Sequence, residues 1–232
     1  MNFHLFKVLT QRCVAGLVIM IISACTPQQM LLSALIPDGT TSMLLSHLQS
    51  VESGNRQRIV ELEQQGDWPG LAKFADDNIA KDPFSAEWRL IGGYAQSQQG
   101  HHARAAEYFG EMVRLSPDDV TGYHFLAEAQ RANGQSQRAV TTLERALLVV
   151  RESALTHRLL GDSYSDLARY RPAAESYRRA LAIDPMLAEA WYGLGRAAQR
   201  MGRTAEVQEA LRALEQMRSP QAVSLRKLLE SS

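Results

Sequence analysis

The sequence has few of the residues that mark a disulfide-stabilised or a nucleic-acid-binding protein. Its two cysteines, Cys13 and Cys25, both lie near the N-terminus, so they offer no disulfide framework for the body of the chain. Aromatic residues make up 7% of the 232 residues, and 25 lysines and arginines balance 25 aspartates and glutamates. We therefore expect neither a base-stacking surface nor a net charge that attracts nucleic acid.

The chain also lacks the common motifs of catalysis and metal binding. It contains no G-x-S-x-G, H-E-x-x-H or P-loop sequence. His101 and His102 lie in an expected turn without a cluster of cysteines or carboxylates, which disfavours a metal site. Residues 193–198 match the dinucleotide pattern G-x-G-x-x-A, but that motif requires a preceding strand, and helices are expected on both sides. We expect no enzyme activity, cofactor, metal or small-molecule substrate; an enzyme with an unrecognised site is the alternative.

The first 25 residues have the order of an export signal. Lys7 and Arg12 precede an unbroken apolar run at 13–22, which has the length of a signal-peptide core and is too short to span a bilayer. Residues 22–25, Ile-Ser-Ala-Cys, resemble the lipobox of bacterial lipoproteins. The resemblance implies cleavage after residue 24 and acylation of Cys25. Thr26, where an aspartate would signal retention at the inner membrane, favours the periplasmic face of the outer membrane.

This interpretation divides the N-terminal part into a signal peptide at 1–24 and a lipidated tether with a short helix at 25–51. An ordinary secretory signal with an incidental Cys25 and a leader that is never cut are the alternatives. Met43 to Val51 has the apolar spacing of a short amphipathic helix. We expect this helix to pack on the first helix pair, with docking to a partner or to the membrane surface as the alternative.

A period of 34 residues runs through the rest of the chain. Five series of side chains follow it: Tyr123, His157 and Trp191; Leu126, Leu160 and Leu194; Ala139, Ala173 and Val207; Phe109, Leu143, Tyr177 and Leu211; and Gly100, Gly134, Ala168 and Gly202. The best copy places Leu160, Gly161 and Tyr164 after His157, followed by Ala173, Tyr177 and Pro185. This resembles the tetratricopeptide pattern W-x₂-L-G-x₂-Y, A-x₃-F, P.

The resemblance implies an all-α fold, an α-α superhelix (tetratricopeptide solenoid) of four to five helix pairs. The expected copies are 85–119, 120–153, 154–187 and 188–218, with a degenerate copy at 52–84 and a C-terminal capping helix within 219–232. Because Trp88 lies 35 residues before Tyr123, we expect one extra residue in the turn near Gly100. Gly161 and Gly195 are expected where two helices approach closely, since larger side chains there would force them apart.

In tetratricopeptide proteins the first helix of each pair lines a concave groove that binds a protein or an extended peptide. By resemblance, the groove-facing residues here are Arg89, His124, Glu128, Arg131, Arg158, Asp162, Tyr192, Arg196 and Arg200. Their arginines suit the carboxylates of a peptide. The alternative is a solvated surface of intramolecular ion pairs, each of which stabilises the fold by about 0–1 kcal/mol.

These features predict a membrane-anchored scaffold for protein–protein interactions in the bacterial cell envelope. Lipoproteins that resemble it include pilotins, which implies a role in assembling a pilus, a secretin or another envelope complex. Recruitment of peptidoglycan enzymes or proteases is the alternative, and a cytosolic adaptor with an uncut leader is a further one.

Overall fold

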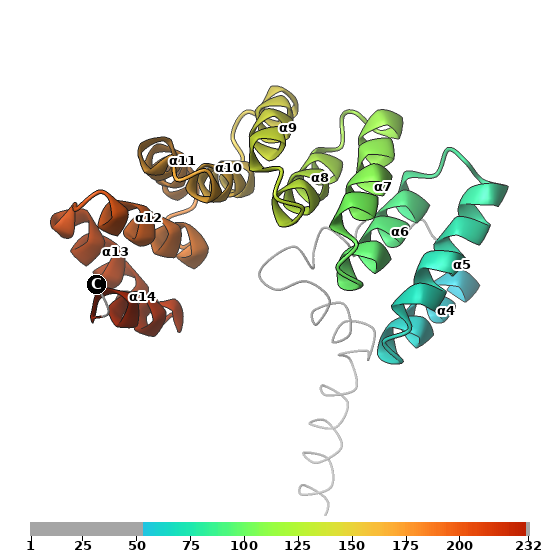
Figure 1. The fold of residues 1–232 in the computed structure, drawn as a ribbon, viewed down its shortest axis with the longest axis horizontal. Helices are drawn as coiled ribbons and strands as arrows, with labels where there is room; N and C mark the ends of the chain where they lie inside the picture. The colour runs from blue at the N-terminus through green and yellow to red at the C-terminus, as the bar shows by residue number, and fades with distance from the viewer. Residues whose placement is uncertain (1–52, 231–232) are drawn as a thin grey trace, which may run out of the picture. The chain divides into compact units, whose positions relative to one another are not determined.

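The computed structural model describes residues 53–230, so the predicted signal peptide, Cys25 and the tether lie outside the described residues. Within 53–230 the eleven regular elements are all α-helices, as the repeat pattern predicts (Figure 1). The chain divides into two compact units between Asp67 and Trp68. The described part of the first unit holds helix α4 (Ser53–Gln64), in which Ile59 and Leu62 are buried.

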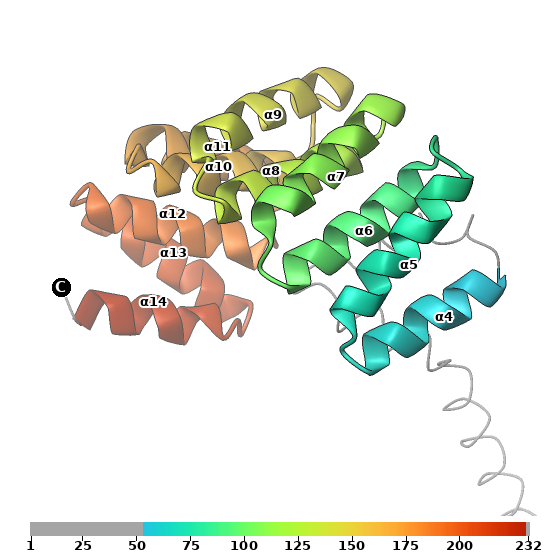
Figure 2. The same cartoon turned by 45° about the vertical axis from the view of Figure 1, so that its right-hand side comes forward.

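The second unit is a continuous series of antiparallel helices. They are α5 (Trp68–Lys81), α6 (Ala86–Gln98), α7 (His102–Leu115), α8 (Val120–Ala132), α9 (Ser136–Val149), α10 (Ala154–Asp166), α11 (Tyr170–Ile183), α12 (Ala188–Arg200), α13 (Thr204–Gln216) and α14 (Gln221–Glu230). Each packs on the next along the chain (Figures 1 and 2). We call α6, α8, α10 and α12 the first helices of their pairs and α7, α9, α11 and α13 the second helices. This arrangement confirms the predicted solenoid of helix pairs.

Small residues set how closely the helices approach. A Cβ atom built on Gly161 of α10 would lie 2.5 Å from Cε1 of Tyr177 on α11. A Cβ on Gly195 of α12 would lie 3.2 Å from the Cβ of Ala210 on α13. Ala173, which follows the turn into α11, is completely buried. These contacts confirm that glycine and alanine occupy the helix crossings.

The turn inside each helix pair has a left-handed backbone at the same repeat position. Its φ angle lies between 71° and 75° at three glycines and is 55° at one alanine: Gly100, Gly134, Gly202 and Ala168. The next amide closes the turn; the Arg169 N–H, for example, donates to the Tyr164 carbonyl at 2.9 Å. Glycine adopts this conformation without the steric conflict that a Cβ causes, which explains the glycine series.

Ala168 is therefore strained at a position where its repeat equivalents are glycine. Replacing Ala168 with glycine is expected to stabilise the protein by about 1 kcal/mol, the cost of a left-handed residue that carries a Cβ. Gly134→Ala, at the equivalent turn, should destabilise it by a similar amount. Urea unfolding of the two variants checks both signs, and equal midpoints would contradict the role assigned to this turn.

The predicted extra residue near Gly100 is wrong. Helices α6 and α7 begin 34 residues before α8 and α9, at 86 and 102 against 120 and 136. Arg89, rather than Trp88, occupies the place of Tyr123: the Arg89 Nη2 donates to the Pro83 carbonyl at 3.2 Å, as the Tyr123 hydroxyl donates to the Pro117 carbonyl at 3.0 Å. The helix caps and the glycine turn determine this register, and Trp88 is buried from the neighbouring position.

The last helix covers the C-terminal end of the stack. Helix α14 packs on both α12 and α13, and its Leu225 is completely buried beside Gly195. Val223, which we also expected to cover this end, is 68% exposed because it lies on the outward side of the helix. Within residues 53–230, no helix is both long and apolar enough to cross a membrane.

Candidate protein-binding face

The first helices present one continuous face. Helix α8 packs on α10 and α10 packs on α12, so side chains from neighbouring repeats meet there without a second helix between them. We call the surface of α8, α10 and α12 the first-helix face. Most of the predicted groove residues lie on these three helices, and the structure shows which of them come together.

A cluster of charges centres on Asp162 of α10. Its carboxylate accepts hydrogen bonds from the Tyr177 hydroxyl at 2.7 Å, from Arg158 Nη1 at 2.9 Å and from Arg131 Nη1 at 3.4 Å. Burial, together with the Asp162 charge, raises the pKa of the Tyr177 phenol, so Tyr177 remains a donor across the physiological range. Asp162 therefore joins α8, α10 and α11.

The remaining charges of α8 and α10 extend this cluster. Arg131 Nε donates to Asp166 at 2.8 Å, and the Ser136 hydroxyl donates to the same carboxylate at 3.3 Å. Glu128 lies 3.9 Å from Arg158. The predicted residues Glu128, Arg131, Arg158 and Asp162 are thus brought together. They largely neutralise one another, as in the intramolecular alternative.

The structure removes His124 from the predicted groove. Its side chain is only 2% exposed, and its Nε2 lies 2.7 Å from Thr156 Oγ1 on α10. Thr156 Oγ1 itself donates to Ser153 Oγ at 2.8 Å, so His124 Nε2 carries the proton of their shared hydrogen bond. Burial, with a smaller effect of the Arg158 charge, lowers the pKa of His124 to about 4. A neutral imidazole suits this position between two helices.

Arg89 also lies away from the first-helix face, because of the one-residue register error described above. With Gln96, it lines a separate pocket of about 430 Å³ formed by side chains of α5, α6 and α7, including Asp76 and Tyr108. The equally spaced N-caps Ser85 and Asp119 are the sequence signal that identifies the correct register.

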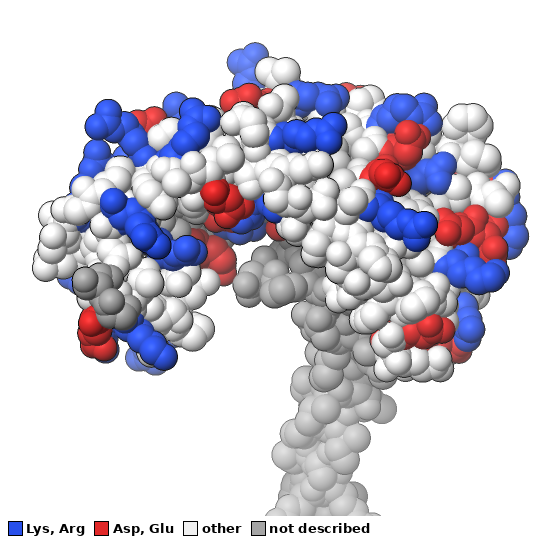
Figure 3. All heavy atoms as spheres, in the orientation of Figure 1, with Lys and Arg blue, Asp and Glu red and all other residues white. Residues whose placement is uncertain are grey.

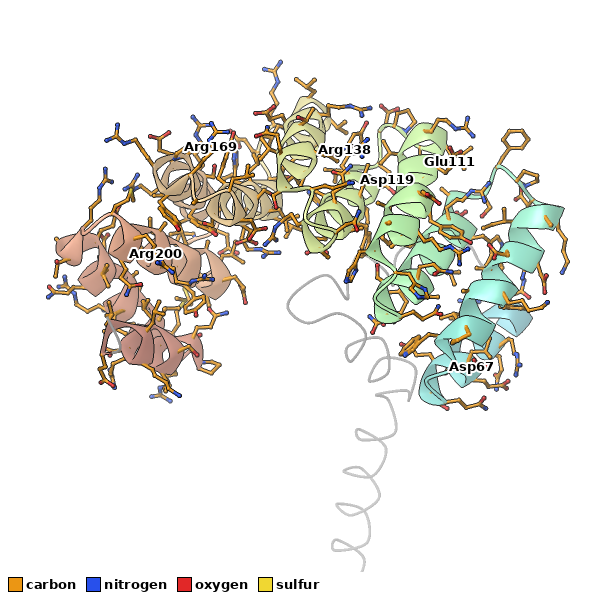
Figure 4. The ribbon with its side chains drawn as sticks, in the orientation of Figure 1. Asp67, Glu111, Asp119, Arg138, Arg169 and Arg200 are labelled. Carbon is orange, nitrogen blue, oxygen red and sulfur yellow. The ribbon has the colours of Figure 1, made fainter. Side chains whose placement is uncertain are left out.

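Helix α12 supplies the cations of the first-helix face that are not neutralised. The Arg196 guanidinium lies 5.7 Å from the centre of the Tyr192 ring. Within the described part of the chain, neither Arg196 nor Arg200 has a carboxylate within 4.0 Å. Figure 4 labels Arg200 on α12. These two arginines are one helical turn apart, so one partner group can reach both.

A pocket of about 130 Å³ lies between these arginines and the Asp162 cluster. Arg131, Asp162, Arg196 and Arg200 are the predicted residues among its lining. Tyr170, Tyr177, Gly193 and Leu228 complete the lining but were not predicted as site residues. Tyr177 follows the repeat as a core residue, and Leu228 comes from the capping helix, so neither carries a sequence signal for a site.

The other candidate chemistry has a structural explanation. Residues 193–198 lie inside α12, so they lack the strand that a dinucleotide-binding loop requires. His101 Nδ1 lies 3.0 Å from Gln96 Oε1 in the turn before α7. Among the residues that the structure describes, no group of three or more histidine, cysteine, aspartate or glutamate side chains is placed to hold a metal ion.

Comparison with known proteins gives the same repeat. Residues 97–162 match the family model described as tetratricopeptide repeat, and residues 161–202 match one described as TPR repeat. No curated protein matches this sequence closely enough to count as a relative.

Solved structures share the fold at low sequence identity. MamA from Desulfovibrio magneticus RS-1, from residue 41 to its end, has a TM-score of 0.63 and 18% identity over 72% of this chain and 94% of that chain. TTC0263, a thermophilic TPR protein in Thermus thermophilus, has a TM-score of 0.57 and 24% identity, over 77% and 96% of the two chains. YrrB, a TPR protein with an unusual peptide-binding site, has a TM-score of 0.58 and 14% identity, over 79% and 97%. Residues 97–202 of this chain are therefore tetratricopeptide repeats, within a helix-pair solenoid of the kind seen in these structures.

Proposed function

We propose that this protein is a membrane-anchored scaffold that binds a protein or an extended peptide on its first-helix face and catalyses nothing. Acylation of Cys25 would hold it at the periplasmic face of the bacterial outer membrane. Assembly of a pilus, a secretin or another envelope complex is the role that this arrangement suits. Several acyl chains give stable attachment, whereas a single chain anchors only marginally.

One observation carries the binding proposal. Arg196 and Arg200 line the pocket beside Asp162 without a carboxylate of their own, whereas Arg131 and Arg158 are paired. Exposed guanidinium groups next to a tyrosine are typical of interface hot spots, and they suit carboxylates of a partner. A related fold, YrrB, is described as having a peptide-binding site, which supports a peptide as the partner here.

Photo-crosslinking in cells tests the face. A photoreactive residue at Gln199, which lines the pocket, is expected to capture a partner that the same residue at Gln208 on α13 does not. Adding Arg196→Glu and Arg200→Glu should lower the captured amount at least about tenfold, since hot spots cost about 1.4 kcal/mol or more. Arg212→Glu, on exposed α13, is the control. Equal capture from positions 199 and 208 would contradict the proposal.

The anchor is tested separately in the same cells. Cys25→Ala is expected to abolish palmitate labelling and to move the protein from the membrane fraction to the soluble fraction. If the variant remains in the membrane fraction with unchanged labelling, the anchor is wrong, whatever the crosslinks show.

A further inference from the structure

Positive charge is concentrated on one part of the second unit although the whole chain is neutral. Helices α9 and α11, with the turns before and after α10, expose six arginines that have no carboxylate within 4.0 Å among the described residues: Arg138, Arg145, Arg151, Arg169, Arg171 and Arg179. We call this surface the arginine face. It also exposes Glu144, Glu152 and Glu175, which leaves an excess of three positive charges. Figure 3 shows blue spheres gathered over α9 and α11, and Figure 4 labels Arg138 and Arg169.

Aromatic rings, rather than acidic side chains, hold two of these arginines. The Arg145 guanidinium lies 5.4 Å from the centre of the Tyr123 ring, and the Arg169 guanidinium lies 4.9 Å from that of Tyr164. Arg179 occupies the position of Arg145 one repeat later, so guanidinium groups recur in register along the solenoid. Cation–π contacts leave the N–H donors of a guanidinium available to an external acceptor.

The preceding second helix has no such excess. Helix α7 exposes Arg104 and Arg114 together with Glu107 and Glu111, and Arg114 pairs with Glu111 at 2.9 Å. In α11, Arg178 is likewise paired, with Glu206 of α13. The unneutralised arginines are thus a local property of two consecutive repeats.

Large apolar side chains are exposed at the C-terminal ends of the same two helices. Leu148 near the end of α9 is 83% exposed, and Met186 in the turn after α11 is 69% exposed. Ile183, the last residue of α11, is 42% exposed. A surface that combines arginines with protruding apolar side chains is typical of segments that lie in the membrane interface. An acidic protein would satisfy the arginines but would not account for these isolated apolar groups.

We propose that the arginine face docks on the anionic phospholipid headgroups of the membrane that carries the acyl anchor, with Leu148 and Met186 entering the interface. Guanidinium groups bind phosphate oxygens in bidentate fashion. This inference rests on the anchoring proposed above, which keeps the bilayer close enough for a weak surface to dock. Docking through the second helices would leave the first-helix face free for its partner.

Depth measurement on vesicles tests the docking independently of the anchor. The acylated full-length protein carrying Leu148→Cys and a spin label would be bound to phosphatidylethanolamine vesicles with and without phosphatidylglycerol. With the anionic lipid, accessibility of the label to a water-soluble nickel chelate should fall severalfold and accessibility to oxygen should rise. Raising salt from about 0.1 M to about 1 M shortens the Debye length from about 10 Å to about 3 Å and should reverse the change.

Charge-matched variants complete the test. Arg145→Glu with Arg179→Glu should return the label to the water-exposed signal, whereas Arg104→Glu with Arg212→Glu, which changes the net charge equally on α7 and α13, should not. Vesicle-bound protein whose label stays in water overturns the docking alone. Protein that binds neither kind of vesicle refutes the anchor and this proposal with it. A label that stays in water on vesicles, with crosslinks from position 148 to an acidic protein in cells, would assign the face to a protein partner instead.

Discussion

Replacing Gly161 with alanine is expected to destabilise the protein by about 1–3 kcal/mol, and replacing it with leucine by more. The new Cβ would lie 2.5–2.8 Å from three ring atoms of Tyr177. Tyr177 cannot move away, because Gly193 of α12 faces the same ring from the next repeat, and its own Cβ would lie 2.4 Å from Cζ. Overpacking at this crossing therefore separates α10, α11 and α12 together. Urea unfolding monitored by circular dichroism gives the loss.

Two variants make this prediction specific. Gly110→Ala, also in a helix but with no atom within 4 Å of the added Cβ, should stabilise the protein by about 1 kcal/mol. The repeat at 120–153 carries Ala127 and Leu143 where this one carries Gly161 and Tyr177. Tyr177→Leu should therefore relieve part of the damage of Gly161→Ala, although Asp162 then loses a donor. Strictly additive effects of these two substitutions would show that the contact is not the cause.

Lowering the pH from 7 to 5 is expected to cost the wild-type protein about 2 kcal/mol more stability than it costs the variant His124→Leu. The pKa of His124 is lowered from 6.5 to about 4 in the fold, so below about pH 6.5 the unfolded chain binds a proton that the folded chain does not. The contribution of neutral His124 is therefore present above pH 6.5 and is lost as the pH falls toward 4. Its Nδ1 is buried and lacks a hydrogen-bond partner among the described residues, so a proton there would place an uncompensated charge in the interior.

Leucine is a suitable replacement because Leu90 fills the equivalent position one repeat earlier and is completely buried. Urea unfolding of both proteins at pH 7 and pH 5 gives the difference in slope, and the carboxylates that titrate in this range are common to the two. An NMR titration of wild type provides a second measurement, in which the His124 ring should titrate near 4. Parallel pH profiles, with a His124 pKa near 6.5, would place this imidazole in solvent.

The charged first-helix face shows the limit of reasoning from repeat positions. Position alone predicted that Arg131, Arg158, Arg196 and Arg200 are equivalent. Only the side-chain distances show that the first two are paired with Asp162 and Asp166 while the last two are not. Neighbouring first helices hold residues about one repeat apart within hydrogen-bonding reach, and which charges meet depends on both partners.

The sequence by itself determined the helix pairs, their length and their turns. Helix periodicity, capping residues and left-handed glycines are local properties that recur every 34 residues, so they can be read from one chain. It also showed where small residues must lie, because Gly161 and Gly195 recur opposite large side chains. The interpretation of the N-terminus as a lipidated leader stays a prediction, since Cys25 lies outside the described residues.

Only the tertiary structure decided which of these residues form a surface. It placed Arg89 one position out of the predicted register and buried His124 against Thr156. It also gathered on two helices the arginines that a neutral total composition conceals. The physical reason is that burial and charge pairing depend on contacts between helices. A shift of one residue turns a side chain by about 100° around the helix axis, enough to move it from an exposed face to a buried one.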